Sequence, residues 1–279
     1  MTAAPLRFDR RGSGPPLVLL HGFTGSALDM APLADAFAGE FEVLSPDLPG
    51  HGGSPIAPGY GFDDAVSDLL ATLEAAGHGR ACWLGYSLGA RLVLACAARR
   101  PACAEALVLI GGRGGIADAA ERESRRQADE ALAARIENDG IEAFVDEWLA
   151  QPLFATQRAL GAAFLGEARR RRLANDPLRL AASLRALGPG AQPPLFDRLP
   201  RVTAPTLLVF GSLDRKFAAA ADELAAGLPD AERCEIAGAG HAAHLERPDQ
   251  FMHAAREFLR ASASPARADH PTPVQETAS

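Results

Sequence analysis

Three side chains that are far apart in the chain could together activate a nucleophile. Ser87 stands at the centre of Gly85-Tyr86-Ser87-Leu88-Gly89, a G-x-S-x-G pattern, and Asp214 and His241 follow much later. A serine hydroxyl becomes reactive beside a base such as histidine, and the histidine needs a carboxylate to orient its ring and stabilise its charged form. We therefore predict that Ser87, His241 and Asp214 form a catalytic triad.

The surroundings of these residues predict the elements that position them. The G-x-S-x-G pattern lies between an apolar run at 81–84 and a helical stretch at 89–99, which predicts a tight turn from a strand into a helix. The free amides at the start of that helix favour developing negative charge. Asp214 follows the apolar run 205–210, and His241 follows a short strand expected at 234–236. The order Ser, Asp, His, with each residue on a loop after a strand, resembles that of the α/β-hydrolase superfamily.

The loop after the first apolar run supplies a candidate oxyanion hole. Residues 16–20 lead into His21-Gly22-Phe23-Thr24-Gly25, and the backbone amide of Phe23 could face an oxyanion together with the amide of Leu88. We expect His21 and His51 to be structural side chains that hold their loops. His244, three residues after His241, is expected to be structural or at the surface.

The apolar runs and helical stretches together predict the fold class. Strands are expected at 16–20, 81–84, 106–110, 205–210 and 234–236. Unbroken apolar runs of this length are typical of parallel strands that are buried on both faces. Helices expected at 65–76, 89–99, 218–226 and 249–259 alternate with these strands. The alternation indicates an α/β protein with a mostly parallel, doubly wound sheet.

A long segment in the second half of the chain interrupts this alternation. It contains only helical stretches, at 121–138, 140–150, 156–174 and 177–187. We predict an α/β-hydrolase core from residues 1–112 and 205–260, and an all-helical lid, 113–204, inserted above the C-terminal edge of the sheet, where ligands of α/β proteins bind. Residues 261–279, rich in Ala, Ser, Pro and Thr, are predicted to be a disordered tail.

Composition and charge narrow the class of protein. The 279 residues carry a formal charge of −7 and are 48% hydrophobic, which excludes a largely disordered chain and disfavours a nucleic-acid partner. No apolar run approaches the roughly 18 residues that cross a bilayer, and no secretion signal is apparent, so no membrane partner is expected. The four cysteines form no C-x-x-C pair. We therefore expect reduced thiols, no metal site, no organic cofactor and a cytoplasmic location.

Several cationic residues lie near the predicted triad in the sequence. Arg91 comes four residues, about one helical turn, after the serine, and Lys216, the sole lysine, comes two residues after Asp214. The predicted lid adds Arg125, Arg126, Arg169, Arg170, Arg171 and Arg172. Four consecutive residues of a helix point in all directions, so at most one or two of the last four can face the site. Because arginine binds carboxylates through paired hydrogen bonds, these residues favour a polyanionic substrate. An ordinary esterase with a basic lid surface is the alternative.

The chain is similar to one family of this superfamily in both the core and the predicted lid. The similar segments are Gly85-Tyr86-Ser87-Leu88-Gly89-Ala90-Arg91, Trp148 with Gln151-Pro152-Leu153-Phe154, Gly188-Pro189-Gly190-Ala191-Gln192-Pro193, Asp214-Arg215-Lys216-Phe217 and Gly240-His241-Ala242-Ala243-His244-Leu245-Glu246-Arg247-Pro248. They resemble the 2-succinyl-6-hydroxy-2,4-cyclohexadiene-1-carboxylate synthases of menaquinone biosynthesis.

This resemblance implies a lyase that eliminates pyruvate from 2-succinyl-5-enolpyruvyl-6-hydroxy-3-cyclohexene-1-carboxylate, a small molecule with three carboxylates, without a metal or organic cofactor. It implies substrate-binding roles for Tyr86, Arg91, Arg125, Trp148, Arg172 and Lys216. Arg125 matches the family's arginine four residues before an Asp, here Asp129, whereas any of Arg169 to Arg172 could match the second lid arginine. The chain departs from the family's usual glycine and aromatic residue at Ala90 and Leu149.

In the expected reaction the serine acts as a base rather than as a group that becomes acylated. Ser87, activated by His241, would remove the ring proton next to the succinyl ketone, and the amides of Phe23 and Leu88 would hold the enolate oxygen. Two alternatives remain open. One is a serine carboxylesterase or C–C bond hydrolase acting on an acidic small molecule, and the other is a binding module without turnover. A monomer or small homo-oligomer is expected.

Overall fold

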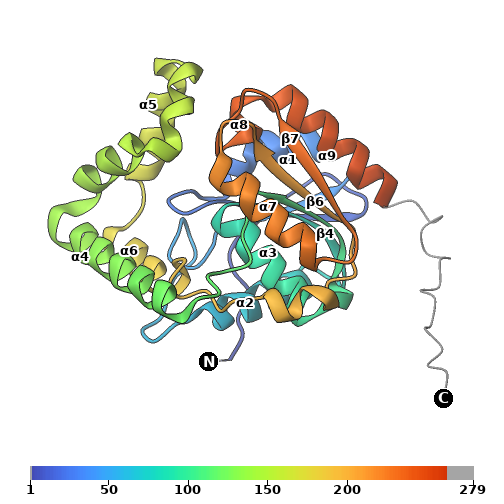
Figure 1. Ribbon diagram of the computed structural model, residues 1–279, viewed down its shortest axis with the longest axis horizontal. Coiled ribbons are helices and arrows are strands. Elements are labelled where there is room, and N and C mark those ends of the chain that lie inside the picture. The colour runs from blue at the N-terminus through green and yellow to red at the C-terminus, as the bar shows by residue number, and fades with distance from the viewer. Residues whose placement is uncertain (1, 263–279) are drawn as a thin grey trace.

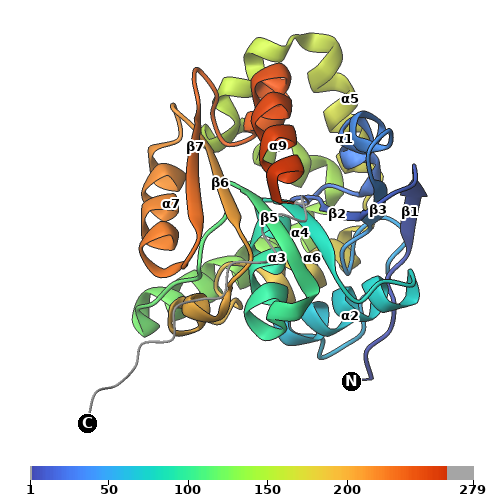
Figure 2. The ribbon, with the colours of Figure 1, turned by 90° about the vertical axis from the view of Figure 1, so that its right-hand side faces the viewer.

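A seven-stranded sheet runs through the middle of the molecule, with helices on both faces (Figures 1 and 2). The computed structural model describes residues 2–262. The strands stand in the order β1-β3-β2-β4-β5-β6-β7, and all neighbours are parallel except β1, which runs antiparallel to β3. Their bounds are β1 Phe8–Arg11, β2 Pro16–Leu20, β3 Glu42–Pro46, β4 Ala81–Tyr86, β5 Ala104–Ile110, β6 Thr206–Gly211 and β7 Ala231–Ile236. The predicted α/β class, with a mostly parallel doubly wound sheet, is confirmed.

Alternate side chains of each central strand point to opposite faces of the sheet and meet different helices. One apolar cluster joins Leu19, Val108 and Val209 to α1 (Ala31–Phe37) and α9 (Pro248–Ser262). The other joins Leu20, Leu107 and Leu208 to α2 (Phe62–Ala75), α3 (Leu88–Arg99) and α7 (Arg215–Gly227). Figure 2 shows α1 and α9 above the sheet and α2 and α3 below it. Burial on both faces explains the unbroken apolar runs of the inner strands.

The five expected strands are confirmed, whereas two further strands were not predicted. β1 is an edge strand of sequence Phe-Asp-Arg-Arg that is only partly buried, so it carries no apolar signal. β3 is well buried but contains only Val43 and Leu44 as large apolar residues, between a glutamate and Ser45-Pro46. The expected helices at 65–76, 89–99, 218–226 and 249–259 are confirmed as α2, α3, α7 and α9, with small differences at their ends.

Between β5 and β6, within the described residues, the chain forms helices and no strand. These are α4 (Ala119–Ala150), the 3₁₀ segment η3 (Pro152–Leu160), α5 (Ala162–Leu173), α6 (Pro177–Leu187) and the 3₁₀ segment η4 (Phe196–Arg201). In Figure 1, α4, α5 and α6 form the left side of the molecule. α4 and α6 share an apolar cluster of their own, which includes Ile136, Val145, Leu180 and Leu184.

Two glycines explain where these helices bend or end. Gly140 has a φ of 82° and kinks α4, at the boundary expected between the helices 121–138 and 140–150. Gly161 has a φ of 87° and separates η3 from α5. The single helix expected at 156–174 is therefore wrong, because its first turn belongs to a 3₁₀ segment and the α-helix begins only after Gly161. α6 has the bounds that were predicted.

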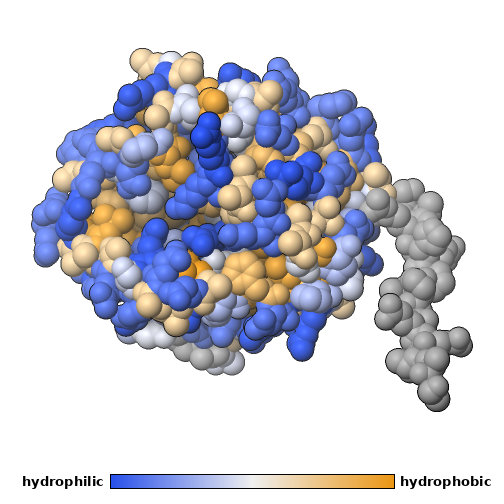
Figure 3. All heavy atoms as spheres, in the orientation of Figure 1, coloured by the Kyte–Doolittle hydropathy of each residue, from blue (hydrophilic) through white to orange (hydrophobic). Residues whose placement is uncertain are grey.

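The start of the expected tail is two residues too early, because Ala261 and Ser262 form the last turn of α9. The rest of that tail, 263–279, lies outside the described residues. Three of the four cysteine thiols are buried and all four are free, as expected. Across residues 2–262, no helix has both the length and the apolar character needed to cross a membrane. On the face shown in Figure 3, hydrophilic residues surround separate smaller apolar patches.

Candidate active site

The turn between β4 and α3 holds Ser87 in a strained backbone conformation. Its φ is 52° and its ψ is −104°, a combination that non-glycine residues rarely adopt. The turn packs directly on the end of β2, since a Cβ on Gly89 would lie 2.3 Å from the Leu20 carbonyl oxygen and 2.8 Å from that of His21. Only glycine permits this approach, which presents the serine side chain at the C-terminal edge of the sheet.

A chain of hydrogen bonds connects the three predicted triad residues. The Ser87 hydroxyl lies 3.1 Å from His241 Nε2, to which it can donate, and His241 Nδ1 lies 3.0 Å from Asp214 Oδ2 and can donate to it. The other carboxylate oxygen of Asp214 accepts from the Phe217 backbone amide at 3.3 Å, because Asp214 caps α7. The arrangement can transfer a proton from the serine to the histidine while the carboxylate orients the ring.

Aromatic side chains fix the plane of the His241 ring. The Phe217 ring lies 4.3 Å from the imidazole centroid, and the Tyr86 ring lies 5.3 Å from it on a different element. His241 is almost completely buried, with 3% of its surface exposed. The imidazole therefore has little freedom to turn away from the serine.

Two buried histidines hold the predicted oxyanion loop. His21 Nε2 accepts a hydrogen bond from the Leu48 amide at 2.9 Å, so its Nδ1 donates to the Gly22 carbonyl at 2.8 Å. His51 Nε2 accepts from the Thr24 amide at 3.3 Å. Burial lowers the pKa of both histidines, that of His51 to about 3, so both rings are neutral at neutral pH. The structural roles expected for both are confirmed.

Phe23 and Leu88 lie on the two segments that meet at Gly89. Neither of their backbone amides donates a hydrogen bond to another group in the part of the chain that the structure describes. Two such amides beside the serine can bind a developing oxyanion.

His244 was expected to be either structural or at the surface, and the structure places it in the interior. It is 4% exposed and packs on Tyr86, with ring centroids 4.6 Å apart. Burial and the nearby His241 lower its pKa to about 3, so the ring is neutral. His244 is therefore a structural wall of the site.

A cavity of about 240 Å³ opens beside Tyr86 and the predicted oxyanion loop, beneath α5. We call it the α5 cavity; its walls include Phe23, Tyr86, Phe164, Ala168, Arg172 and His244. Arg172 donates through Nη1 to the Ala168 carbonyl at 2.9 Å, whereas its buried Nε has no partner within the described residues. Of the four consecutive arginines, Arg172 is thus a cation of the cavity wall with a free donor.

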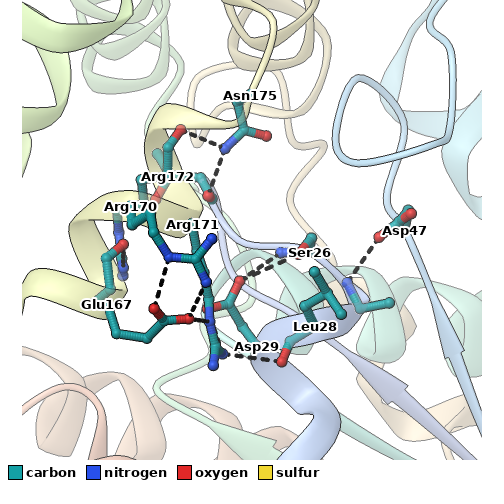
Figure 4. Close-up of polar contacts among 12 residues, drawn as sticks. Ser26, Leu28, Asp29, Asp47, Glu167, Arg170, Arg171, Arg172 and Asn175 are labelled. Atoms are coloured by element: carbon teal, nitrogen blue, oxygen red, sulfur yellow. Dashed lines mark hydrogen bonds and ion pairs between the residues drawn. The ribbon is translucent and has the colours of Figure 1, made fainter. Parts of the chain in front are cut away.

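The other three arginines of the run make ion pairs with carboxylates of the protein. Arg171 also reaches the cavity wall, but it contacts Glu167 and Asp29 and donates to the Leu28 carbonyl at 3.1 Å (Figure 4). Arg170 pairs with Glu167, and Arg169 pairs with Asp146 and Glu142. Arg171 therefore ties α5 to the loop before α1.

A second group of cations lies outside the walls of the α5 cavity. It comprises Arg91, Arg113, Arg125 and Lys216, and we call it the Arg91 cluster. Burial and the charges of Arg125 and Arg113 lower the pKa of Arg91 to about 9, although Asp129 opposes this shift. Burial and the same two arginines also lower the pKa of Lys216, against the opposing effects of Asp214 and Glu121. Cations that destabilise one another favour the binding of an anion between them.

Trp148 lies at the junction of the predicted lid and the oxyanion loop. Its ring centroid is 5.4 Å from that of Phe23 and 5.6 Å from that of Phe154. The indole Nε1 is buried and has no partner among residues 2–262. Leu149, the departure from the family pattern, packs with the cluster of α4 and α6.

Five of the six residues expected to bind substrate fall into two groups, and the sixth, Trp148, belongs to neither. Tyr86 and Arg172 line the α5 cavity, whereas Arg91, Arg125 and Lys216 belong to the Arg91 cluster. Sequence reasoning missed Arg113, and it assigned no contact with the arginines to Gln192 or Asp129, although it named both residues. In the described part of the chain, no group of three His, Cys, Asp or Glu side chains could hold a metal ion.

Comparison with known proteins identifies the class. A model of the alpha/beta hydrolase family matches residues 17–254, which is most of the chain. An esterase from Thermogutta terrifontis, solved with malate bound, superposes with a TM-score of 0.79 at 25% identity, covering 92% of this chain and 94% of its own. Fold and site therefore define an enzyme of the alpha/beta hydrolase class.

Two further similarities specify the family. The chain is 35% identical over 252 residues to 2-succinyl-6-hydroxy-2,4-cyclohexadiene-1-carboxylate synthase of Escherichia coli O1:K1, covering 88% of this chain and 94% of that protein. The structure of MenH from S. aureus superposes with a TM-score of 0.87 at 30% identity, covering 92% and 98% of the two chains. The chain belongs to the 2-succinyl-6-hydroxy-2,4-cyclohexadiene-1-carboxylate synthase family, as its sequence motifs had indicated.

Proposed function

We propose that this protein eliminates pyruvate from 2-succinyl-5-enolpyruvyl-6-hydroxy-3-cyclohexene-1-carboxylate to give 2-succinyl-6-hydroxy-2,4-cyclohexadiene-1-carboxylate. The observation that carries the proposal is a hydrogen-bonded Ser87, His241 and Asp214 together with two groups of cations, one in the wall of the α5 cavity and one around Arg91. A neutral ester gains nothing from two separate groups of cations, whereas a substrate with three carboxylates can use both. Family membership supports the same assignment.

The reaction is a proton removal followed by loss of a leaving group. The Ser87 oxygen takes the ring proton next to the succinyl ketone while its own proton passes to His241 Nε2. Asp214 stabilises the imidazolium, and the amides of Phe23 and Leu88 hold the enolate oxygen. The electron pair then moves through the ring and breaks the bond to the enolpyruvyl oxygen. That oxygen recovers the proton from His241, and the released enolpyruvate becomes pyruvate.

The binding residues have the task of placing the acidic C–H against Ser87. Arg172 and Tyr86 would hold one part of the substrate in the α5 cavity, and Arg91, Arg125 and Lys216 would hold carboxylates on the other side. Trp148 would contact the substrate where its indole N–H lacks a partner. Holding the reacting groups in this geometry lowers the activation barrier, because their orientation is already fixed when the substrate binds.

The helical segment 113–204 acts as a lid in this proposal. It supplies Arg125, Trp148 and Arg172, while the sheet and its flanking helices supply the triad. A lid that delivers binding residues also excludes water from the enolate. We place the reaction in the cytoplasm, and a monomer or small homo-oligomer remains the expected form.

The test is the rate of pyruvate release from freshly made substrate. The substrate decays spontaneously, so the protein is compared with buffer and with Ser87→Ala. Release far above buffer that is lost in Ser87→Ala, with substrate binding retained, is expected. Release no faster than buffer would reject the substrate, and a panel of esters and acidic ring-cleavage products would then test the hydrolase alternative. Strong residual turnover in Ser87→Ala would reject the serine as the base.

A further inference from the structure

Gln192 is a fully buried side chain that lies in direct contact with the Arg91 cluster. Its Oε1 accepts a hydrogen bond from Arg91 Nη1 at 3.2 Å, and its Nε2 donates to the Arg113 carbonyl oxygen at 3.3 Å. It is 0% exposed, and Arg91 is 7% exposed. No step of the proposed reaction uses Gln192, yet it contacts the buried guanidinium closest in sequence to the serine.

The chemistry of an amide suits this position better than that of a carboxylate. An amide can accept from a guanidinium with one end and donate to a carbonyl with the other, whereas a carboxylate can only accept. A neutral acceptor also adds no negative charge beside Arg91 to compete with a substrate carboxylate. The guanidinium is therefore held in place while its attraction for a substrate carboxylate is preserved.

The turn that carries Gln192 also contacts the lid arginine. The Gly190 amide donates to Asp129 Oδ2 at 2.9 Å, and Asp129 Oδ1 accepts from Arg125 Nε at 2.8 Å. The turn lies directly on α4, because a Cβ on Gly190 would come within 2.4 Å of the Arg126 backbone nitrogen. Residues 188–192 thus contact Arg91 through Gln192 and reach Arg125 through Asp129.

We propose that Gln192 is a positioning residue that directs Arg91, and that the turn 188–192 sets the spacing between Arg91 and Arg125. The two guanidinium groups then bind carboxylates of one substrate molecule at a defined distance. Gln192 contributes to specificity for the polyanionic substrate without touching the reacting atoms. This inference rests on the proposed function, because the carboxylates belong to its substrate.

Steady-state pyruvate release is measured for the wild type, Gln192→Leu, Gln192→Glu, Arg91→Ala and the double variant Arg91→Ala/Gln192→Leu. Gln192→Leu keeps the size of the side chain but removes the acceptor, and KM should rise roughly 10- to 100-fold with a much smaller change in kcat. Gln192→Glu should raise KM as well, because its charge competes with the substrate for Arg91. In the Arg91→Ala background, Gln192→Leu should have no further effect.

Gln127→Leu is the matched control, because Gln127 is exposed and its amide donates only to Glu123 on α4. Its kinetics and melting temperature should equal those of the wild type. The proposal is overturned if either Gln192 variant keeps the wild-type KM, or if the full effect of Gln192→Leu persists without Arg91. Persistence would show that the substitution acts through folding rather than through the arginine.

Crystal structures of the wild type and Gln192→Leu give a readout that needs no turnover. The Arg91 guanidinium should leave its position in the variant while the triad and α3 stay unchanged. An unmoved guanidinium would overturn the positioning role whatever the substrate is. Absence of pyruvate release by the wild type would instead defeat the proposed function, so the two failures are distinguishable.

Discussion

The triad and the cations around it are held in place by different means. Ser87, Asp214 and His241 each follow the end of a strand, and the backbone of the sheet brings them together. The cations depend on side-chain contacts between distant segments, such as that between Arg91 and Gln192, 101 residues apart. Arg171 of α5 likewise reaches the loop before α1. In the proposed function, the sheet would therefore determine the chemistry, and the contacts of the segment 113–204 would determine which molecule is bound.

The largest effect on activity is expected from a substitution in the triad, whose residues are positioned by the backbone of the sheet. Asp214→Asn should lower kcat for pyruvate release by about 10²- to 10⁴-fold, because an amide cannot stabilise the imidazolium and favours the wrong tautomer of His241. KM should change little, since Asp214 lies behind the histidine. Pyruvate release and the melting temperature are measured together. A fall of less than tenfold at unchanged melting temperature would contradict the assigned role.

The next largest effect is expected from a fall in pH, which should destabilise the region of the buried histidines but leave the ion pairs of α5 intact. The folded-state pKa values of His51 and His244 lie near 3, below the usual unfolded value of about 6.5. The contribution of these two rings to folding stability is therefore full above about pH 6.5 and is lost as the pH falls. The loss is at most about 1.4 kcal/mol per pH unit for each histidine. Hydrogen bonds from Arg170 and Arg171 lower the pKa of Glu167 to about 2, so this carboxylate stays charged over the same pH range.

Melting temperatures between pH 7.5 and pH 4.5 check this expectation. The wild type should lose stability steadily below pH 6.5, and His51→Gln should lose less, because its side chain cannot be charged. His253→Gln is the control, since His253 is exposed and pairs only with Glu257. A melting temperature that stays constant down to pH 4.5 would show that the oxyanion loop does not depend on neutral histidines.

The smallest effect is expected at the contact between α5 and the core. Arg171→Ala removes the ion pair with Asp29 and the hydrogen bond to the Leu28 carbonyl (Figure 4). Exposed ion pairs contribute little, so KM should rise only about two- to fivefold and kcat should be retained. Arg170→Ala, which loses a contact within α5, should leave both constants unchanged. A large fall in kcat for Arg171→Ala would show that the arginine acts on the reaction itself.

The triad could be predicted from the sequence because each member lies in a local pattern. Glycines flank Ser87 where a Cβ on Gly89 would lie 2.3 Å from the Leu20 carbonyl oxygen of β2, and Asp214 and His241 follow recognisable strands. The sheet was predictable for the same reason, apart from β1 and β3. One of these is an exposed edge, and the other has too few large apolar residues to produce a signal.

The binding residues were harder to predict because their roles depend on distant contacts. Consecutive helical residues differ by about 100° in direction, so the run of arginines could not reveal that Arg172 lines the cavity. Gln192 belongs to a recognisable motif, but nothing near it in the sequence identifies Arg91 as its partner. Asp129 was noticed only as a marker for Arg125, whereas its second oxygen binds the turn at Gly190.

Lys216 is a side chain that an amine-reactive reagent could modify selectively. It carries the sole lysine amine of the chain, and partial burial together with the nearby arginines lowers the pKa of that amine. At a given pH more of it is unprotonated, and therefore nucleophilic, than an ordinary surface lysine would be. Among side chains, an amine-selective reagent therefore has one target, and that target lies two residues from Asp214. If Lys216 holds a substrate carboxylate as proposed, bound substrate should slow the modification of this amine, whereas the many arginines would remain unmodified.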